Sequence, residues 1–299
     1  MSEQLTKVIE LLKATASEGE PTVEQGRARL EALAARAPLP ADVRRQAVEV
    51  PGLCAEWVTA PGAARDRAVL YLHGGSYCYG SLSTHRERAK RVSRAAHAQV
   101  LLVEYRLAPE NPFPAAVEDS VAAYRWLLAH GVQPSHLAVA GDSAGGGLAI
   151  AALVSLRDAG NPMPAAAVCV SPWTDLAGTG DSMTSRAAID PRIKRYKLMK
   201  EAGWYLAGAD PRTPLASPLY ADLRGLPPLL IQVGTAEVLY DDSSRLAERA
   251  RAAGVDVTLE VWESMIHGWQ AFAYMLPEGQ EGINHLGDFV LQRTRGADA

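Results

Sequence analysis

Apolar and polar residues follow one another in blocks along this chain, and the blocks predict alternating strands and helices. Five apolar runs are nearly continuous, which is typical of strands buried on both faces of a parallel sheet. These runs lie at residues 67–75, 98–107, 136–143, 165–172 and 227–235. The segments between them favour helices, which we expect at 83–96, 114–130, 143–158 and 241–253. This alternation predicts an α/β fold with a mostly parallel sheet flanked by helices.

Shorter patterns flank this alternation. Two runs at 46–50 and 54–60 surround the turn dipeptide Pro51–Gly52 and predict a pair of strands. The stretch 255–263 alternates apolar and polar residues with period two, so we expect a last strand at an edge of the sheet. Such an edge can pair with its copy across a two-fold axis, which leaves a homodimer open beside a monomer.

The N-terminal segment favours helices. Thr22 is expected to start the second helix, with Gln25 completing a capping box, and Pro38 and Pro40 break the helical pattern. The first helix carries apolar residues at helical spacing, namely Leu5, Val8, Ile9 and Leu12.

One further segment interrupts the strand–helix alternation, between residues 181 and 217. Asp190 is a candidate N-cap and Pro191 a candidate first helical residue, and Leu198, Ala202 and Tyr205 would share a face. We therefore expect two cap segments, 1–45 and 181–217, carried on an α/β core formed by residues 46–180 and 218–299.

Composition and charge narrow the functional classes. The 299 residues are 48% hydrophobic and carry a formal net charge of −4, without the basic block that nucleic-acid binding needs. No apolar run reaches the roughly 18 residues of a membrane span. The N-terminal residues also lack the continuous apolar core of a signal peptide. A cytoplasmic protein without a nucleic-acid partner or a membrane span is expected.

The cysteines point to structural roles. There are three of them, widely spaced, which argues against a disulfide framework or a zinc cluster. Cys169 lies in an apolar run and is expected in the core. Cys78 lies beside one of the motifs described next and is also interpreted as structural.

The stretch Gly141–Gly145 reads GDSAG and carries the first candidate chemistry. It stands between an apolar run and a helical pattern, and it matches the G-x-S-x-G turn of serine hydrolases. In that turn small residues give clearance to a strained backbone, which projects the serine hydroxyl at a helix N-terminus. Ser143 is therefore a candidate nucleophile.

A serine nucleophile needs a base and an acid that orients the base. In this kind of fold the acid follows the serine along the chain, and the histidine comes last. His267 is the best-placed histidine, because it follows the last expected strand. Glu237 directly follows the run 227–235 and is favoured as the acid. Asp241 and Asp242 are the alternatives, although they start a helix, where acidic residues are stabilising in any case.

Acyl transfer also needs hydrogen-bond donors for the negatively charged oxygen that develops in the transition state. Gly74 and Gly75 follow an expected strand and offer unobstructed N–H groups, and Ala144 offers another at the helix start. His73 is interpreted as a brace for this loop and not as the base.

Four stretches together resemble the hormone-sensitive-lipase-like family of α/β-hydrolases, which are mostly bacterial carboxylesterases. The first three are HGGSYCYGS, VEYRLAPENPFPAAVEDS and GDSAGGGLA, and the fourth pairs GLPPLLIQVGTAEVLYDDS with MIHGW. They occur in family order between Tyr71 and Trp269. The prolines of the second stretch predict a rigid corner that can contain cis peptide bonds.

The resemblance implies a helical cap and hydrolysis of short- to medium-chain esters without cofactor or metal. It places the triad on Ser143, Glu237 and His267, and the oxyanion hole on Gly74, Gly75 and Ala144. Two positions depart from the family pattern: Ser76 replaces a glycine, and the acid is more often aspartate. A substrate pocket is expected from residues near the motifs and on the inserted helix, namely Trp173, Tyr205, Leu206, Val238 and Trp269.

Related chemistries stay open at this point. A lactone hydrolase, an arylformamidase or another amidase could use the same triad. A non-catalytic small-molecule receptor of the same family is a further alternative, which the presence of His267 disfavours. Members of the resembled family often dimerise through the last strand, which makes residues 255–263 a candidate dimer interface.

Overall fold

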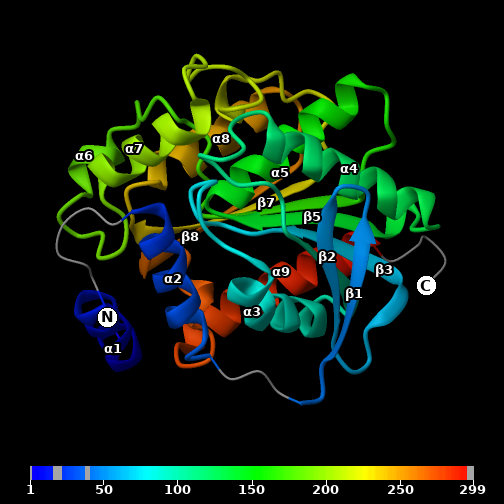
Figure 1. Cartoon of the computed structure of the whole chain (residues 1–299), viewed down its shortest axis with the longest axis horizontal. Helices are drawn as coiled ribbons and strands as arrows, with labels where there is room; N and C mark the ends of the chain where they lie inside the picture. The colour runs from blue at the N-terminus through cyan, green and yellow to red at the C-terminus, as the bar shows by residue number, and fades with distance from the viewer. Residues whose placement is uncertain (1, 16–21, 38–40, 295–299) are drawn as a thin grey trace.

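An eight-stranded sheet forms the centre of the protein in the computed structural model, which describes residues 2–15, 22–37 and 41–294 (Figure 1). The strand order is β1-β2-β4-β3-β5-β6-β7-β8. Strand β2 pairs antiparallel with both of its neighbours, β1 and β4, and the remaining pairs are parallel. The strands are β1 (Arg44–Val50), β2 (Leu53–Thr59), β3 (Ala64–Leu72), β4 (Ala98–Val103), β5 (Leu137–Asp142), β6 (Ala166–Val170), β7 (Leu229–Ala236) and β8 (Val257–Ile266). The predicted mostly parallel sheet is confirmed, and β8 lies at its edge as expected.

Helices cover both faces of the sheet (Figure 1). One face carries α3 (Leu82–Ala95) and α9 (Pro277–Thr294), and the other carries α4 (Ala115–Ala129), α5 (Ala144–Asp158) and α8 (Tyr240–Ala252). The four helices predicted in the alternating region all occur, each within one residue of its predicted bounds. Short 3₁₀ turns lie at η1 (Pro134–His136), η2 (Pro218–Tyr220) and η3 (Trp269–Phe272).

The continuous apolar runs are explained by burial on both faces. In β4, Leu101 and Val103 pack on the α4–α5 side, whereas Val100 and Leu102 pack on the α3–α9 side. Because successive strand residues point to opposite faces, a strand covered on both sides needs apolar residues at every position.

Four further helices gather at the left of Figure 1. They are α1 (Glu3–Ala14), α2 (Val23–Ala34), α6 (Ser182–Ser185) and α7 (Arg195–Leu206). The predicted capping box is confirmed, because the Thr22 hydroxyl accepts from Gln25 N–H while the Gln25 side chain accepts from Thr22 N–H. Pro38 and Pro40 lie outside the described residues.

The predicted start of the inserted helix is wrong. The helix α7 begins at Arg195, four residues after Pro191, and its N-cap is Lys194. Asp190 Oδ1 instead accepts hydrogen bonds from the N–H groups of Arg192 and Ile193, which closes a local turn before the helix.

The proline-rich corner between β4 and α4 contains cis peptide bonds, as its prolines predicted. The peptide bonds Ala108–Pro109 and Phe113–Pro114 are cis. Phe113 N–H donates to the carbonyl of Tyr205 at 2.7 Å, so this corner contacts the end of α7.

Candidate active site

Ser143 lies at a sharp turn between β5 and α5, as the GDSAG motif predicted. Its backbone torsions are φ 54° and ψ −123°, which residues with a Cβ rarely adopt. A Cβ at Gly141 would collide with the carbonyl of Gly145, and a Cβ at Gly145 would collide with the carbonyl of Leu72. The flanking glycines therefore give the turn the clearance that it needs.

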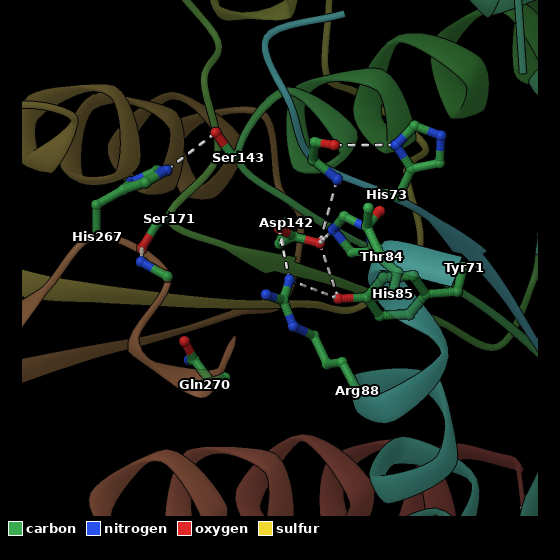
Figure 2. A network of polar contacts seen from close by, with 12 residues as sticks. Tyr71, His73, Thr84, His85, Arg88, Asp142, Ser143, Ser171, His267 and Gln270 are labelled. Atoms are coloured by element: carbon green, nitrogen blue, oxygen red, sulfur yellow. Dashed lines mark hydrogen bonds and ion pairs between the residues drawn. The ribbon is translucent and has the colours of Figure 1, made fainter. Parts of the chain in front are cut away.

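The side chains of Ser143, His267 and Glu237 form one hydrogen-bonded chain. Glu237 follows β7 and His267 follows β8, so both lie where neighbouring parallel strands end. His267 Nε2 lies 3.0 Å from Ser143 Oγ (Figure 2). On the other side of the ring, His267 Nδ1 lies 2.7 Å from Glu237 Oε2. All three residues are buried, and Ser143 has the largest exposed fraction, 8%.

Ser171, which the sequence analysis did not identify, fixes the acid and the histidine loop together. Its hydroxyl donates to Glu237 Oε1 at 2.8 Å and accepts from Gly268 N–H at 3.2 Å. The same Glu237 oxygen accepts from Gly234 N–H at 2.7 Å. One carboxylate oxygen is thus held by two donors, which leaves the other to face His267.

The two alternative acids make other contacts. Asp241 Oδ2 accepts from Ser182 N–H, and Asp242 Oδ2 accepts from the N–H groups of Thr174 and Asp175. Both lie in the first turn of α8, but neither caps its backbone. Burial raises the pKa of the Asp242 carboxyl from 3.8 to about 8, against the two backbone hydrogen bonds, which lower it.

Asp242 leads to a prediction on stability. The folded protein keeps this proton up to about pH 8, whereas the unfolded chain loses it near pH 4. The unfolded chain therefore binds fewer protons between these values, and the contribution to stability is lost as the pH rises through that window. Asp242→Asn removes the titration, so its free energy of unfolding relative to wild type should rise by about 4 kcal/mol from pH 5 to pH 9.

Urea unfolding of both proteins at pH 5, 7 and 9 measures this difference. A gap that stays constant or shrinks with rising pH would show that Asp242 is already ionised in the folded protein.

The loop after β3 lies directly against the turn that carries Ser143. Gly74 N–H donates to Asp142 Oδ1 at 3.3 Å, so this amide is already engaged. For the N–H groups of Gly75 and Ser76, hydrogen-bond acceptors are absent within the described ranges. Ser76 has φ 53°, a left-handed conformation that a glycine would adopt at lower cost. Ala144, the first residue of α5, follows Ser143.

His73 is placed as a brace. Its Nδ1–H donates to Gly74 carbonyl at 2.9 Å, and its ring stacks on Tyr105 with 4.2 Å between centroids. Tyr105 hydroxyl donates to the His73 carbonyl at 2.7 Å. Burial lowers the pKa of His73 to about 3, so the ring is neutral at ordinary pH. It makes no contact with Ser143 that could serve proton transfer.

The side chain of Ser76 contacts helix α7. Hydrogen bonds from Ser76 and Tyr79 lower the pKa of Glu201, on α7, but burial raises it further, and the net shift is upward. Cys78 is buried, its Sγ lies 3.8 Å from the carbonyl of Glu201, and burial raises the pKa of its thiol far above the ordinary value. The structural interpretation of Cys78 agrees with this environment, because a reactive cysteine is ionised more easily than usual.

Comparisons with known proteins place the chain among esterases. A family model described as the alpha/beta hydrolase fold matches residues 69–271. An acetyl-hydrolase of Streptomyces hygroscopicus is 54% identical over 240 residues, which cover 80% of each chain. Carboxylesterase NlhH of Mycobacterium tuberculosis is 38% identical over 234 residues, covering 74% of this chain and 72% of its own. A solved esterase of the bacterial hormone-sensitive lipase family matches with TM-score 0.97 and 51% identity, covering 99% of both chains. The chain belongs to the hormone-sensitive-lipase-like α/β-hydrolases.

Membership of this family confirms the predicted resemblance and the reaction class, carboxylic-ester hydrolysis. The described part of this hydrolase contains no helix with the length and apolar character needed to cross a bilayer.

The five residues expected to line a substrate pocket fall into different surroundings in the hydrolase. Trp173 and Tyr205 pack on the ring of Tyr77, which is stacked on Tyr205 with 3.9 Å between centroids. Trp269 packs in a separate cluster with apolar residues of α1. All five are buried, with exposed fractions of 8% or less: Trp173, Tyr205, Leu206, Val238 and Trp269.

The segment before α7 contacts both loops that carry the hydrogen-bonded chain. Asp190 Oδ2 accepts from the N–H of Val238, the residue after Glu237, at 2.9 Å. Arg192 Nη1 donates to the carbonyl of His267 at 2.9 Å. The inserted segment of this hydrolase therefore holds the acid loop and the histidine loop in place.

This contact predicts a kinetic effect of Arg192. Arg192→Met removes the donor to His267 while keeping much of the side-chain volume, and it should lower kcat for p-nitrophenyl acetate about tenfold, since small misplacements of catalytic groups are costly. Arg195→Met, at an exposed position on α7, is the matched control and should stay within about twofold of wild type. Equal kcat values for the two variants would show that the contact does not position His267.

Proposed function

We propose that Ser143, His267 and Glu237 are the catalytic triad of this carboxylesterase. The observation that carries the proposal is the hydrogen-bonded chain from Ser143 Oγ through both nitrogens of His267 to Glu237 Oε2, with distances of 3.0 and 2.7 Å. Ser143 Oγ attacks the ester carbonyl carbon while His267 Nε2 takes the hydroxyl proton. His267 then gives that proton to the leaving alcohol, and an acyl-enzyme remains on Ser143.

Hydrolysis of the acyl-enzyme repeats the sequence with water. His267 takes a proton from the water as it attacks the acyl carbon, and returns the proton to Ser143 Oγ when the acid leaves. Glu237 keeps the proton of His267 on Nδ1 in the resting state, and its charge stabilises the imidazolium in each transition state.

The oxyanion donors in this proposal are the N–H groups of Gly75, Ser76 and Ala144. The sequence motif predicts Gly74 in place of Ser76. The change rests on the contact between Gly74 N–H and Asp142, which occupies that donor, and on the absence of an acceptor for Gly75 and Ser76 in the described ranges. Gly74 then contributes by anchoring the loop.

We assign short- to medium-chain carboxylic esters as substrates. Trp173 supports a confined acyl site, because its backbone N–H donates to the Ser143 carbonyl at 2.9 Å and its indole ring packs on Tyr77. The relative from Streptomyces hygroscopicus is named an acetyl-hydrolase, which agrees with small acyl groups.

A substrate panel tests the assignment. Values of kcat/KM are measured for p-nitrophenyl esters of increasing acyl length, for lactones and for anilides. The proposal expects the highest values for short acyl esters. Fast lactone opening or anilide cleavage beside barely measurable ester turnover would instead identify a lactonase or an amidase.

Three further parts of the proposal concern the molecule as a whole. Segments 1–45 and 181–217 act as the cap, although Arg44 and Arg45 already pair with β2. The enzyme is cytoplasmic, which agrees with three cysteines without disulfide bonds.

Two copies of the enzyme pair through β8, which lies at the edge of the sheet and in which Val261 is 45% exposed. Light scattering of wild type and Val261→Lys tests the dimer, and a monomeric wild type would exclude it.

A further inference from the structure

A buried carboxylate lies immediately before the nucleophile. Asp142 is the last residue of β5, and only 5% of it is exposed. Its side chain points away from His267, toward β3 and α3 (Figure 2). The proposed triad does not use this carboxylate, so its position beside Ser143 needs another explanation.

The Asp142 carboxylate joins the loop after β3 to helix α3. Oδ1 accepts from Tyr71 hydroxyl at 3.0 Å and from Gly74 N–H at 3.3 Å, and His85 Nε2 lies 3.5 Å away. Oδ2 lies 2.5 Å from Arg88 Nη1 (Figure 2). The fit is close, because a Cβ on Gly74 would come within 2.5 Å of Oδ2.

The charges of this cluster are well defined. Burial alone would raise the pKa of Asp142, but the charge of Arg88 and the hydrogen bond from His85 outweigh it and hold the pKa well below its usual value. Burial lowers the pKa of His85, so His85 is neutral at ordinary pH. Arg192 also interacts with Asp142 electrostatically, but its guanidinium bonds to the carbonyl of His267. The formal charge that directly contacts Asp142 is therefore that of Arg88.

We propose that Asp142 and Arg88 are a positioning pair for the oxyanion hole: Asp142 anchors Gly74, and Arg88 cancels the carboxylate charge that would otherwise oppose the developing oxyanion. The inference rests on the proposed triad and oxyanion donors. Neither residue touches the substrate in this scheme, and both act through the loop and through the electrostatic potential at the site.

The physical reason is the low polarity of the buried site. Charges interact there more strongly than in water, so an uncompensated carboxylate one residue from Ser143 would destabilise the negatively charged tetrahedral intermediate. An arginine that pairs with it removes that penalty. The carboxylate can then serve as a rigid acceptor for Gly74 N–H, and this fixes the following amides, Gly75 and Ser76.

Three variants separate anchoring from charge. Arg88→Met leaves a buried carboxylate beside the oxyanion, and kcat should fall about 10²-fold, the size of the loss of one oxyanion donor. Asp142→Asn keeps an acceptor for Gly74 and leaves a positive charge, so its kcat should fall only about tenfold. The double variant removes both charges and should recover kcat at least about tenfold over Arg88→Met. KM should change less than about threefold in each.

A transition-state analogue gives a readout that a purely structural role would not move. Ser143 Oγ adds to the carbonyl carbon of a trifluoromethyl ketone, which places negative charge on the ketone oxygen while His267 takes the proton. Arg88→Met should weaken inhibition by trifluoromethyl ethyl ketone about 10²-fold, as it lowers kcat, and should leave the affinity for the corresponding alcohol unchanged.

Arg86→Met is the matched control. Arg86 lies on the same helix and pairs with the buried carboxylate of Glu56, with 2.9 Å from Nε to Oε1, away from Ser143. This variant should lose stability in thermal unfolding but keep wild-type kcat and ketone affinity. Arg88→Lys, which retains the charge, should keep kcat within about tenfold of wild type and covers the case in which Arg88→Met does not fold.

The outcomes are distinct. A double variant no more active than Arg88→Met, or equal losses in the two single variants, overturns the charge-cancelling role. Loss of kcat in Arg88→Lys as large as 10²-fold overturns it as well. A wild-type enzyme that binds the ketone no better than the alcohol contradicts the proposed triad and oxyanion hole themselves, before any variant is compared.

Discussion

Ser143→Ala should lower kcat for p-nitrophenyl acetate by about 10⁶-fold, the size of loss found when a serine hydrolase loses its nucleophile. The reason is that the variant has no atom to carry the acyl group, and His267 is left without the hydroxyl that lies 3.0 Å from its Nε2. KM should change little, because alanine removes no atom that binds the substrate before the attack. Stopped assays at saturating substrate, over hours, measure the residual rate.

A fluorophosphonate probe checks the same prediction without turnover. Wild type should be labelled at one serine, and Ser143→Ala should not be labelled. Ser171→Ala is the matched control, because Ser171 is also buried near His267 but bonds to Glu237. It should remain labelled at Ser143 even where its kcat is lower. Labelling of Ser143→Ala, or unchanged hydrolysis by it, would contradict Ser143 as the nucleophile, whereas a wild type that is neither labelled nor active would favour the receptor alternative.

Much of the core could be predicted, because a strand that is buried on both faces is a continuous run of apolar residues in the local sequence. β4 reads AQVLLV, and its apolar residues alternate between the two faces of the sheet. Thr22 and Gln25 were also predictable, since a capping box depends only on residues three positions apart.

Asp190 shows where local patterns mislead. The dipeptide Asp190–Pro191 has the composition of a helix start, yet α7 begins at Arg195. The Asp190 carboxylate is already used by the turn at Arg192 and by Val238 N–H, which is 48 residues away along the chain. A contact of that range has no signature in the local sequence, so the N-cap prediction could not weigh it.

The candidate site also contains residues that the sequence could predict and residues that it could not. Ser143, Glu237 and His267 each follow an apolar strand run, so strand order alone could nominate them. Arg88 could not be nominated, because α3 carries many basic residues that look alike in sequence. Only its tertiary placement beneath Asp142 separates Arg88 from Arg86.

Glu237→Gln should lower kcat about 10⁴-fold, the effect of removing the charge while keeping the geometry of a triad acid. Glu237 Oε1 accepts from Ser171 hydroxyl and Gly234 N–H, so the amide oxygen of glutamine takes that position. The amide NH₂ then faces His267 Nδ1, which must accept instead of donate. The imidazole proton moves to Nε2, where it prevents His267 from taking the proton of Ser143.

Two variants control for charge and shape. Glu237→Asp keeps the carboxylate but shortens it, so kcat should fall about 10²-fold, less than in Glu237→Gln. Asp242→Asn makes the matching acid-to-amide change in a buried carboxyl that bonds to Thr174 and Asp175 N–H, and it should keep kcat within about threefold of wild type. Measurements of kcat at saturating p-nitrophenyl acetate compare all three. A Glu237→Gln enzyme that keeps a tenth of wild-type kcat would show that another group orients His267. With the amide NH₂ facing Nδ1, a neutral imidazole carries its proton on Nε2, and it then cannot accept the proton of Ser143.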